Sequence, residues 1–542
     1  MNPDGMSYLD VGTSFFRHDW ANAINAWWSP LYPWAIGAVL GIFNPSPRWE
    51  FPLVHLVNFA IFAIAMGTFE AFLRALLRWQ RGLSTTGAAG ETEVVPECAL
   101  RCCAYAIFWW IALEVETVYD VAPDLAVAAC FFATCALLLR LKEKDQLWKF
   151  VLFGLCLSVG YWTKAVLFPL GFVVLAAAYW WKRSQPHWRK GIVVAAVTFV
   201  VACSPLIFLL SKQKGRFTFG DSGRGNYAWT MFQEIQHRNW QGLEPGSGPP
   251  VHPTRQLLEH PPVYEFDGPV GGTYPPRTDP SYWNEGLHAR FQIRSEIRVL
   301  LVNIPSEIRL LTREQPGLLV GIVALALLGG YSWWKNLRRV WPLAAISLAG
   351  MAAYVPLVEN DRYLGGFVAV LFLLLLWAGP AGTSNKKAVL CILAAVFVSM
   401  ALSTGDYTVR VLSGHYAIPG VAPNSRWQDV VAAEELWGMG LRPGDKVAIV
   451  GDGTSAYWAR LARLRIVAEI MEAKHATVDF WKSSPQTQAQ VYTAFQRAHA
   501  VKAVATCFSG CPAEIPPGWQ QIAGTPYWIR SLSDVPSLRT VK

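Results

Sequence analysis

Long apolar runs separated by short polar connections dominate the sequence from about residue 52 onward. A helix needs roughly twenty apolar residues to cross the ~30 Å hydrocarbon core of a bilayer. Runs of about this length or somewhat shorter occur near residues 52–78, 98–119, 122–141, 149–162, 165–181, 191–211, 316–334, 340–357, 363–379 and 386–402. The pattern therefore predicts an α-helical polytopic membrane protein with about ten spans.

Basic residues occupy every second connection between these runs, as at Arg78, Lys142, Lys182, Arg338 and Lys386. Positively charged connections of membrane proteins stay in the cytoplasm. The opposite side then receives the N-terminal segment 1–51, the long connection 212–315, the C-terminal region 403–542, and three tight turns at 119–123, 161–164 and 359–362. Because no span precedes residues 1–51, either the N-terminus starts outside or a further span lies upstream.

The runs 149–162 and 165–181 are short, and the connections flanking the pair are both basic. The pair must therefore cross the membrane an even number of times. We expect two short helices that meet at Trp162-Thr163-Lys164, and their length allows this turn to lie within the membrane.

The two long polar regions are expected to fold outside the membrane. The 212–315 connection is rich in Pro, Gly and aromatic residues, which predicts a folded loop, with an amphipathic helix at Ile293–Leu311. The last region predicts a small α/β domain. Its expected helices are Arg426–Gly440 and Ser455–Leu464, and its expected strands are Lys446–Val450, Ala500–Thr506 and Tyr527–Leu532. Cys507 and Cys511 there either form a disulfide bond or remain free.

Composition supports a membrane protein and argues against a nucleic-acid partner. The chain is 53% hydrophobic and 16% charged, with 26 Trp residues, whereas soluble domains carry roughly 25% charge. Aromatic rings of this kind are enriched at membrane interfaces. The net charge of +9 comes from short clusters between apolar runs, so it reports topology and not nucleic-acid binding.

Several ionisable residues fall on the predicted outer face. They are Asp4 and Asp10 in the N-terminal segment, Asp124 at the start of a span, Lys164 between the two short helices, and Arg362 beside Asp361. Each has a structural explanation: a turn for Asp4, a helix cap for Asp124, snorkelling for Lys164, and a local ion pair for Arg362. Together they suit group transfer from a phosphate, with a carboxylate as proton acceptor and cations to neutralise the leaving group.

The chain resembles the GT-C glycosyltransferases, the group that contains protein O-mannosyltransferases and bacterial aminoarabinose transferases of lipid A. Five segments within residues 1–402 carry the resemblance. They are Asp4-Gly5-Met6-Ser7-Tyr8, Trp28-Ser29-Pro30-Leu31-Tyr32-Pro33-Trp34, Pro123-Asp124-Leu125, Thr163-Lys164 and Arg362-Tyr363-Leu364. Many relatives have Asp-Glu where this chain has Asp4-Gly5, and aminoarabinose transferases have a lysine where this chain has Ser29.

The resemblance implies an inverting hexosyl- or pentosyltransferase of the plasma (inner) membrane. Its donor would be a sugar on polyprenyl phosphate, and its acceptor an extracytoplasmic lipid, glycan or protein. Asp4 would be the general base and Asp124 would support it, while Lys164 and Arg362 would contact the donor phosphate. Tyr8, Asp10 and Tyr363 are further candidates for substrate binding.

The implied organisation is an extracytoplasmic catalytic loop and interfacial segment (1–51), spans (52–211), a long external loop (212–315), spans (316–402) and an external α/β domain (403–542). No cofactor is predicted with certainty. A divalent cation could use the outer carboxylates, but no ligand set has a recognisable spacing.

Two other functions remain open from the sequence. A solute transporter also carries carboxylates among its spans, although internal repeats and broken helices at mid-membrane are typical of transporters. A non-catalytic membrane protein could use the external domain to bind a partner.

Overall fold

The computed structural model describes residues 1–86, 97–231, 255–266, 268, 270–283, 291–357, 360–379, 386–413, 425–470, 476–506 and 511–533. The chain forms two compact units. Unit 1 comprises Met1–Leu56, Glu234–His288 and Ala417–Lys542, and unit 2 comprises Val57–Gln233 and Ala289–Tyr416.

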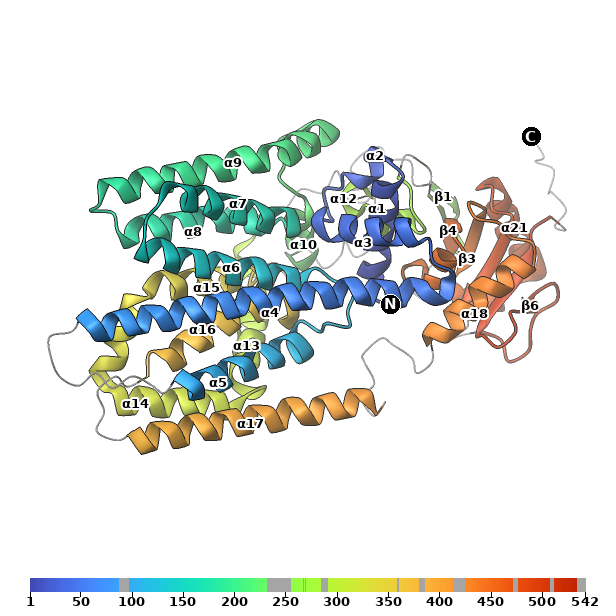
Figure 1. The fold of residues 1–542 in the computed structure, drawn as a ribbon. Coiled ribbons are helices and arrows are strands. Elements are labelled where there is room, and N and C mark those ends of the chain that lie inside the picture. The colour runs from blue at the N-terminus through green and yellow to red at the C-terminus, as the bar shows by residue number, and fades with distance from the viewer. Residues whose placement is uncertain are drawn as a thin grey trace. The chain divides into compact units, whose positions relative to one another are not determined.

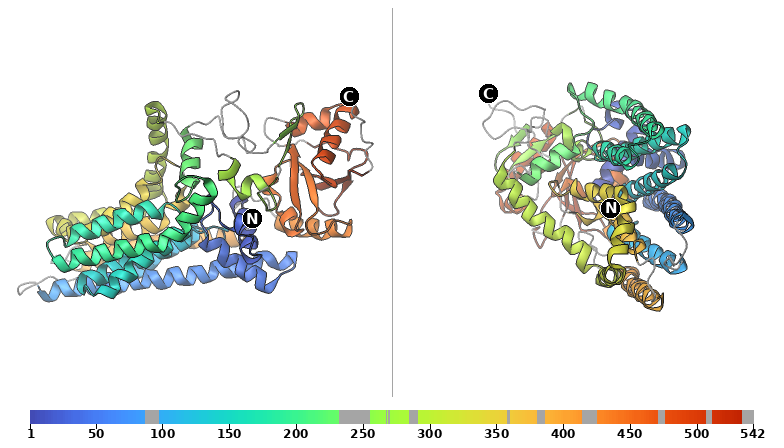
Figure 2. Two further views of the ribbon diagram at one scale, coloured as in Figure 1. Left: turned by 90° about the horizontal axis from the view of Figure 1, so that it is seen from above. Right: turned by 90° about the vertical axis from the view of Figure 1, so that its left-hand side faces the viewer.

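Unit 2 is a bundle of apolar helices (Figure 1), and the right-hand view of Figure 2 looks along it. Its helices are α4 (Pro47–Thr86, which begins in unit 1), α5 (Glu97–Trp110, continued by the π-helix Ile111–Val115), α6 (Asp124–Glu143), α7 (Leu147–Thr163), α8 (Leu167–Trp181), α9 (Pro186–Lys214), α10 (Ser222–Met231), α13 (Ile293–Arg313), α14 (Pro316–Arg339), α15 (Trp341–Ala352), the 3₁₀ turn Asp361–Tyr363, α16 (Gly365–Trp377) and α17 (Lys386–Leu412). Each of the ten predicted apolar runs forms a helix. Ile293–Leu311 is also helical, as predicted.

Six helices in the described part of the chain are long and apolar enough to cross a membrane: Pro47–Trp79, Glu97–Val115, Asp124–Glu143, Pro186–Lys214, Pro316–Arg339 and Lys386–Leu412. The shorter apolar helices α7, α8, α15 and α16 complete the bundle. Helix α6 has 72% of its most apolar window buried, whereas α9, α14 and α17 have 28% each. Helix α6 therefore lies inside the bundle, and α9, α14 and α17 offer apolar surface to lipid. The protein is a multi-pass membrane protein.

Unit 1 combines three N-terminal helices with a seven-stranded sheet. The helices are α1 (Pro3–Phe16), α2 (Trp20–Ala23) and α3 (Leu31–Phe43). The strands are β1 (Arg255–Leu258), β2 (Val263–Glu265), β3 (Lys446–Val450), β4 (Arg465–Ile470), β5 (Lys502–Thr506), β6 (Gln520–Gln521) and β7 (Tyr527–Ser531), in the order β1-β2-β4-β3-β5-β7-β6. Only β4-β3 and β3-β5 are parallel among these pairs. The remaining helices are α11 (Pro275–Thr278), α12 (Pro280–Trp283), α18 (Ser425–Gly438), α19 (Tyr457–Leu461), α20 (Ala476–Lys482) and α21 (Pro485–Arg497).

The predicted fold class is confirmed: apolar spans with a small α/β domain near the C-terminus. The two helices and three strands predicted in the C-terminal region form within a few residues of their predicted bounds. The sequence did not predict β4, α20 or α21, or that β1 and β2, from the 212–315 connection, pair at the edge of β4. Cys511 is disulfide-bonded. Cys507, its predicted partner, lies outside the described residues.

The N-terminal segment was predicted to contain a catalytic loop with a turn at Asp4, and this was wrong for residues 4–10, because they lie in helix α1. Pro3 stands in the first turn of that helix, where a missing N–H costs nothing, and the Asn2 side chain accepts a hydrogen bond of 2.6 Å from the Gly5 N–H. Gly12 of α1 lies against α3: a Cβ there would come 2.4 Å from the Pro33 carbonyl oxygen. The stretch that reads as an Asp-Gly turn is thus the capped start of a closely packed helix.

Candidate functional site

In unit 2, Asp124 binds two cations at one end of the helix bundle. Asp124 stands in the first turn of α6, as predicted, and only 3% of its side chain is exposed. The Lys164 ammonium, at the α7–α8 turn, lies 2.6 Å from its Oδ1. Arg362, in the 3₁₀ turn before α16, places its Nε 3.4 Å from Oδ2. Two cations and one carboxylate leave the trio with one formal positive charge.

Two tyrosine rings line the approach to Lys164. The Tyr363 ring centroid lies 3.6 Å from the Lys164 ammonium, and the Tyr354 centroid lies 5.6 Å away. The two rings stack on each other with centroids 5.2 Å apart. Contacts between an ammonium and an aromatic face are attractive and strengthen when water is excluded. The rings therefore hold Lys164 in place without neutralising it.

A second carboxylate, Glu116, lies close to this trio. It follows the π-helix Ile111–Val115 and is only 4% exposed. Its Oε1 would meet a Cβ at Gly365 at 2.5 Å, so only glycine leaves room for this carboxyl at the start of α16. Glu116 Oε2 has no hydrogen-bond partner among the described residues. The sequence did not single out Glu116 or Tyr354, since each lies at the end of an apolar helix, away from the recognised motifs.

In unit 1, Asp4 forms an ion pair with Arg277 of α11. Asp4 lies in the first turn of α1, where the helix dipole favours a negative charge. Arg277 is fixed through its backbone: its carbonyl oxygen accepts hydrogen bonds from the Ser7 hydroxyl at 3.0 Å and the Trp28 indole at 3.1 Å. Arg277 thus places a cation beside Trp28, with the guanidinium carbon 5.9 Å from the ring centroid. The sequence gave no signal for it.

Tyr8 and Asp10 of α1 have different surroundings. Tyr8 is buried against the rings of Trp28 and Tyr32, with centroids 4.9 and 5.2 Å away.

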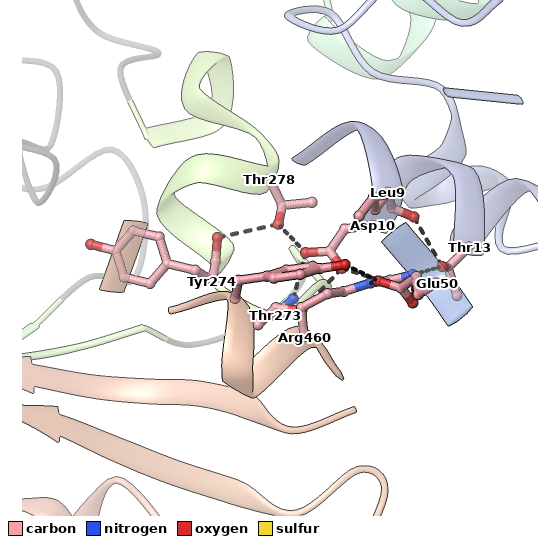
Figure 3. Close-up of polar contacts among 9 residues, drawn as sticks. Leu9, Asp10, Thr13, Glu50, Thr273, Tyr274, Thr278 and Arg460 are labelled. Carbon is pink, nitrogen blue, oxygen red and sulfur yellow. Dashed lines mark hydrogen bonds and ion pairs between the residues drawn. The ribbon is translucent and has the colours of Figure 1, made fainter. Parts of the chain in front are cut away.

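Figure 3 shows the contacts of Asp10: its Oδ2 accepts from the Thr273 N–H at 2.8 Å, and Arg460 Nη1 lies 2.9 Å from its Oδ1. Arg460 also faces Glu50 at 3.4 Å. Burial opposes the positive charge of Arg460, but Glu50 and Asp10 outweigh it and raise the pKa of Arg460.

The structure thus gathers four of the seven predicted site residues, Asp124, Lys164, Arg362 and Tyr363, in unit 2. Asp4, Tyr8 and Asp10 lie along α1 in unit 1. Within the described residues there is no group of three or more His, Cys, Asp and Glu side chains that could hold a metal ion. Asp4 faces Arg277, and Asp124 faces Lys164 and Arg362.

No family model and no curated protein matches the chain. Among solved structures, its fold is similar to ArnT from Cupriavidus metallidurans in the apo state, at 12% identity and a TM-score of 0.49, over 93% of this chain and 88% of that chain. It is also similar to the oligosaccharyltransferase AglB from Archaeoglobus fulgidus in complex with an inhibitory peptide and a dolichol-phosphate, at 11% identity and a TM-score of 0.49, over 93% of this chain and 65% of that chain. ArnT bound to undecaprenyl phosphate aligns at 14% identity and a TM-score of 0.41, over 98% of this chain and 94% of that chain. Likenesses of this degree leave the function to be argued from this chain's own residues.

Proposed function

We propose that this protein is an inverting glycosyltransferase of the plasma membrane that moves a sugar from a polyprenyl-phosphate donor to an extracytoplasmic acceptor. The observation that carries the proposal is the trio of Asp124, Lys164 and Arg362. Charges at the ends of apolar helices are costly and are usually functional. A trio with one surplus positive charge suits the phosphate of a lipid whose tail lies in the bilayer.

The proposed reaction needs one base and one site of charge neutralisation. Asp4 takes the proton of an acceptor hydroxyl as its oxygen attacks the anomeric carbon. The bond from that carbon to the phosphate oxygen breaks, and the phosphate leaves with the electron pair. Lys164 and Arg362 stabilise the negative charge that grows on it. Attack from the face opposite the phosphate inverts the anomeric carbon.

The assigned residues belong to one side of the membrane in the topology that the basic connections predict. Asp4, the Lys164 turn and the Arg362 turn all fall outside the cytoplasm on that pattern. The acceptor is accordingly an extracytoplasmic lipid, glycan or protein, and the α/β part of the chain is proposed to lie on the same side.

Asp4→Asn tests the base. The variant keeps the shape of the side chain but cannot take a proton at neutral pH, so transfer should fall about 10²–10⁴-fold. The donor must be identified before transfer can be measured. Native mass spectrometry of the detergent-purified protein should reveal a co-purified polyprenyl-phosphate sugar by its mass. Transfer is then measured with that donor.

The matched control is Asp406→Asn on α17, where the Asp406 side chain is 60% exposed and paired with Arg410. This variant should keep wild-type transfer. If the Asp4→Asn variant kept full transfer activity, Asp4 would not be the general base. A bound small polar solute, with no lipid phosphate retained even after a donor panel is added, would instead favour a transporter.

A further inference from the structure

A polar cavity of about 520 Å³ lies within unit 1. Helices α1 and α3, the start of α4, the segment before α11 and the α19–β4 turn all contribute to its lining. Its volume falls within the range of small-molecule sites. The assigned base Asp4 does not line it, and Asp10 stands six positions after Asp4 in α1, or roughly 9 Å along the helix.

The inner wall of the cavity is rigid and charged. Asp10 is 4% exposed, and the Arg460 side chain is 11% exposed. Arg460 bridges Asp10 and Glu50, and its Nη2 donates to the Thr13 hydroxyl at 2.9 Å (Figure 3). Glycine at position 272 (φ +87°) lets the chain pass this wall, because a Cβ there would come 3.0 Å from Asp10 Oδ2.

The outer part of the cavity carries cations without carboxylate partners. The Arg17 guanidinium makes no hydrogen bond or ion pair with any described residue, and the side chain is exposed. Among the described residues, the Arg463 side chain donates only to the Asn44 side-chain oxygen, at 2.8 Å. The guanidinium group of an arginine without a carboxylate partner offers a planar fork of N–H donors that fits a carboxylate or a phosphate.

The backbone at Arg463 belongs to the turn that ends helix α19. Its φ of +56° is left-handed, a conformation that glycine adopts at no steric cost and a long side chain disfavours. Asn44, its hydrogen-bond partner, is also left-handed, with φ of +40°. Both residues stand at helix ends: the Arg463 N–H donates to the Arg460 carbonyl oxygen at 2.9 Å and the Leu464 N–H to that of Ala459 at 2.8 Å, and the Asn44 N–H donates to the Leu40 carbonyl oxygen at 2.8 Å. The ends of α19 and α3 thus fix the two residues in the cavity lining.

The rest of the lining suits a ligand with several hydroxyl groups. Thr13, Ser14, Asp19 and Asn44 supply side-chain donors and acceptors around the arginines. The Phe16 ring, 43% exposed, offers an apolar face. Sugar rings carry both hydroxyls and an apolar face of C–H groups.

We propose that this cavity binds an anionic saccharide, a sugar unit that bears a carboxylate or a phosphate. The site goes beyond the proposed transfer reaction and does not depend on it. The ligand is either the anionic part of the acceptor or a separate soluble saccharide.

The test measures the binding of glucuronic acid and glucose 6-phosphate to the detergent-purified full chain by saturation-transfer NMR titration. Glucose is the neutral comparison probe, and inorganic phosphate, which has no carbon-bound proton to observe, is titrated as a competitor of glucose 6-phosphate. Both anionic sugars should bind at least tenfold more tightly than glucose or phosphate. Arg17→Gln and Arg463→Gln should each weaken their binding about tenfold, which corresponds to about 1.4 kcal/mol. Both residues are at the surface, so the fold should be retained; far-UV circular dichroism checks this.

Arg497→Gln, an exposed arginine on α21 outside the cavity lining, is the matched control and should bind like wild type. Glucose binding as tightly as the anionic sugars, phosphate alone matching them, or unchanged binding by both cavity variants would each overturn the proposal. Transfer assays then identify the source of the ligand. Competitive inhibition by the bound sugar against acceptor marks an acceptor subsite, and an unchanged rate marks a separate ligand. Asp4→Asn should bind both sugars normally, so failure of the catalytic assignment leaves this result intact.

Discussion

Asp124→Asn should destabilise unit 2 strongly, because it removes the carboxylate with which both Lys164 and Arg362 are paired. The side chain of Asp124 is 3% exposed and that of Lys164 is 20% exposed, so water can replace little of the lost interaction. Removing one partner of a buried ion pair costs about 3–5 kcal/mol of unfolding free energy. Lys164→Met should cost less, since Arg362 still faces Asp124 at 3.4 Å.

The two substitutions together give a sharper expectation than either alone. In the Asp124→Asn background, Lys164→Met removes one of two uncompensated cations, so it should be neutral or stabilising there. In the wild-type background the same change is destabilising. The coupling energy between the two sites should therefore be about 1–3 kcal/mol.

Unfolding of the purified protein by SDS in mixed micelles, followed by tryptophan fluorescence, measures these free energies. The exposed pair of Asp406 and Arg410 is the control, because Asp406→Asn should change stability by less than about 1 kcal/mol. If Lys164→Met lowers stability equally in both backgrounds, the trio does not act as an ion-paired unit and our reasoning about it fails.

Three other measurements test the structure. Transfer activity should decline at acid pH as the base takes up a proton, and a flat profile down to about pH 4 would count against a carboxylate base. Burial raises the pKa of Asp429 to about 7 from its ordinary value, although the Tyr527 hydroxyl donates to it at 2.7 Å. A raised pKa stabilises the fold at acid pH, so thermal stability of unit 1 should fall between about pH 4 and 7, by at most about 1.4 kcal/mol per pH unit, and Asp429→Asn should flatten this dependence. Gly37→Ala places a Cβ 2.0 Å from the carbonyl oxygen of Gly12, so it should cost at least about 1–3 kcal/mol in chemical unfolding, whereas Gly405→Ala, in open space on α17, should be neutral or slightly stabilising. Equal stability of the two glycine variants would contradict the close α1–α3 crossing.

The sequence predicted the apolar spans because their signal is local. Each of the ten runs carries its own hydrophobic length, and each forms a helix. Asp124 could be placed because Pro123 precedes an apolar run, a typical helix start. Its pairing with Lys164, 40 residues away, followed only from the predicted topology.

The features that were missed depend on distant contacts. Strands β1 and β2 have 4 and 3 residues, too few for a pattern, and they gain order by pairing beside β4. Helix α1 was missed because its Asp-Gly pair is typical of a turn, while its stability comes from the Asn2 cap and packing against α3. Arg277 and Arg460 lie more than 250 residues from the carboxylates that they contact, so no local pattern marks them.

The lengths of the helices explain how charged groups can occupy unit 2. Helices α7, α8, α15 and α16 have 17, 15, 12 and 13 residues, or roughly 18–26 Å of length. This is less than the ~30 Å of a hydrocarbon core. All four border the same cluster: Lys164 joins α7 to α8, Tyr354 follows α15, and Arg362 precedes α16. The short helices thus leave the apolar block incomplete at one end, while longer helices such as α6 and α9 keep its full length. Polar turns can fill that space at a lower cost of burial than charges placed within a full span, and this is where the proposed function places the donor phosphate, within reach of a lipid tail in the bilayer.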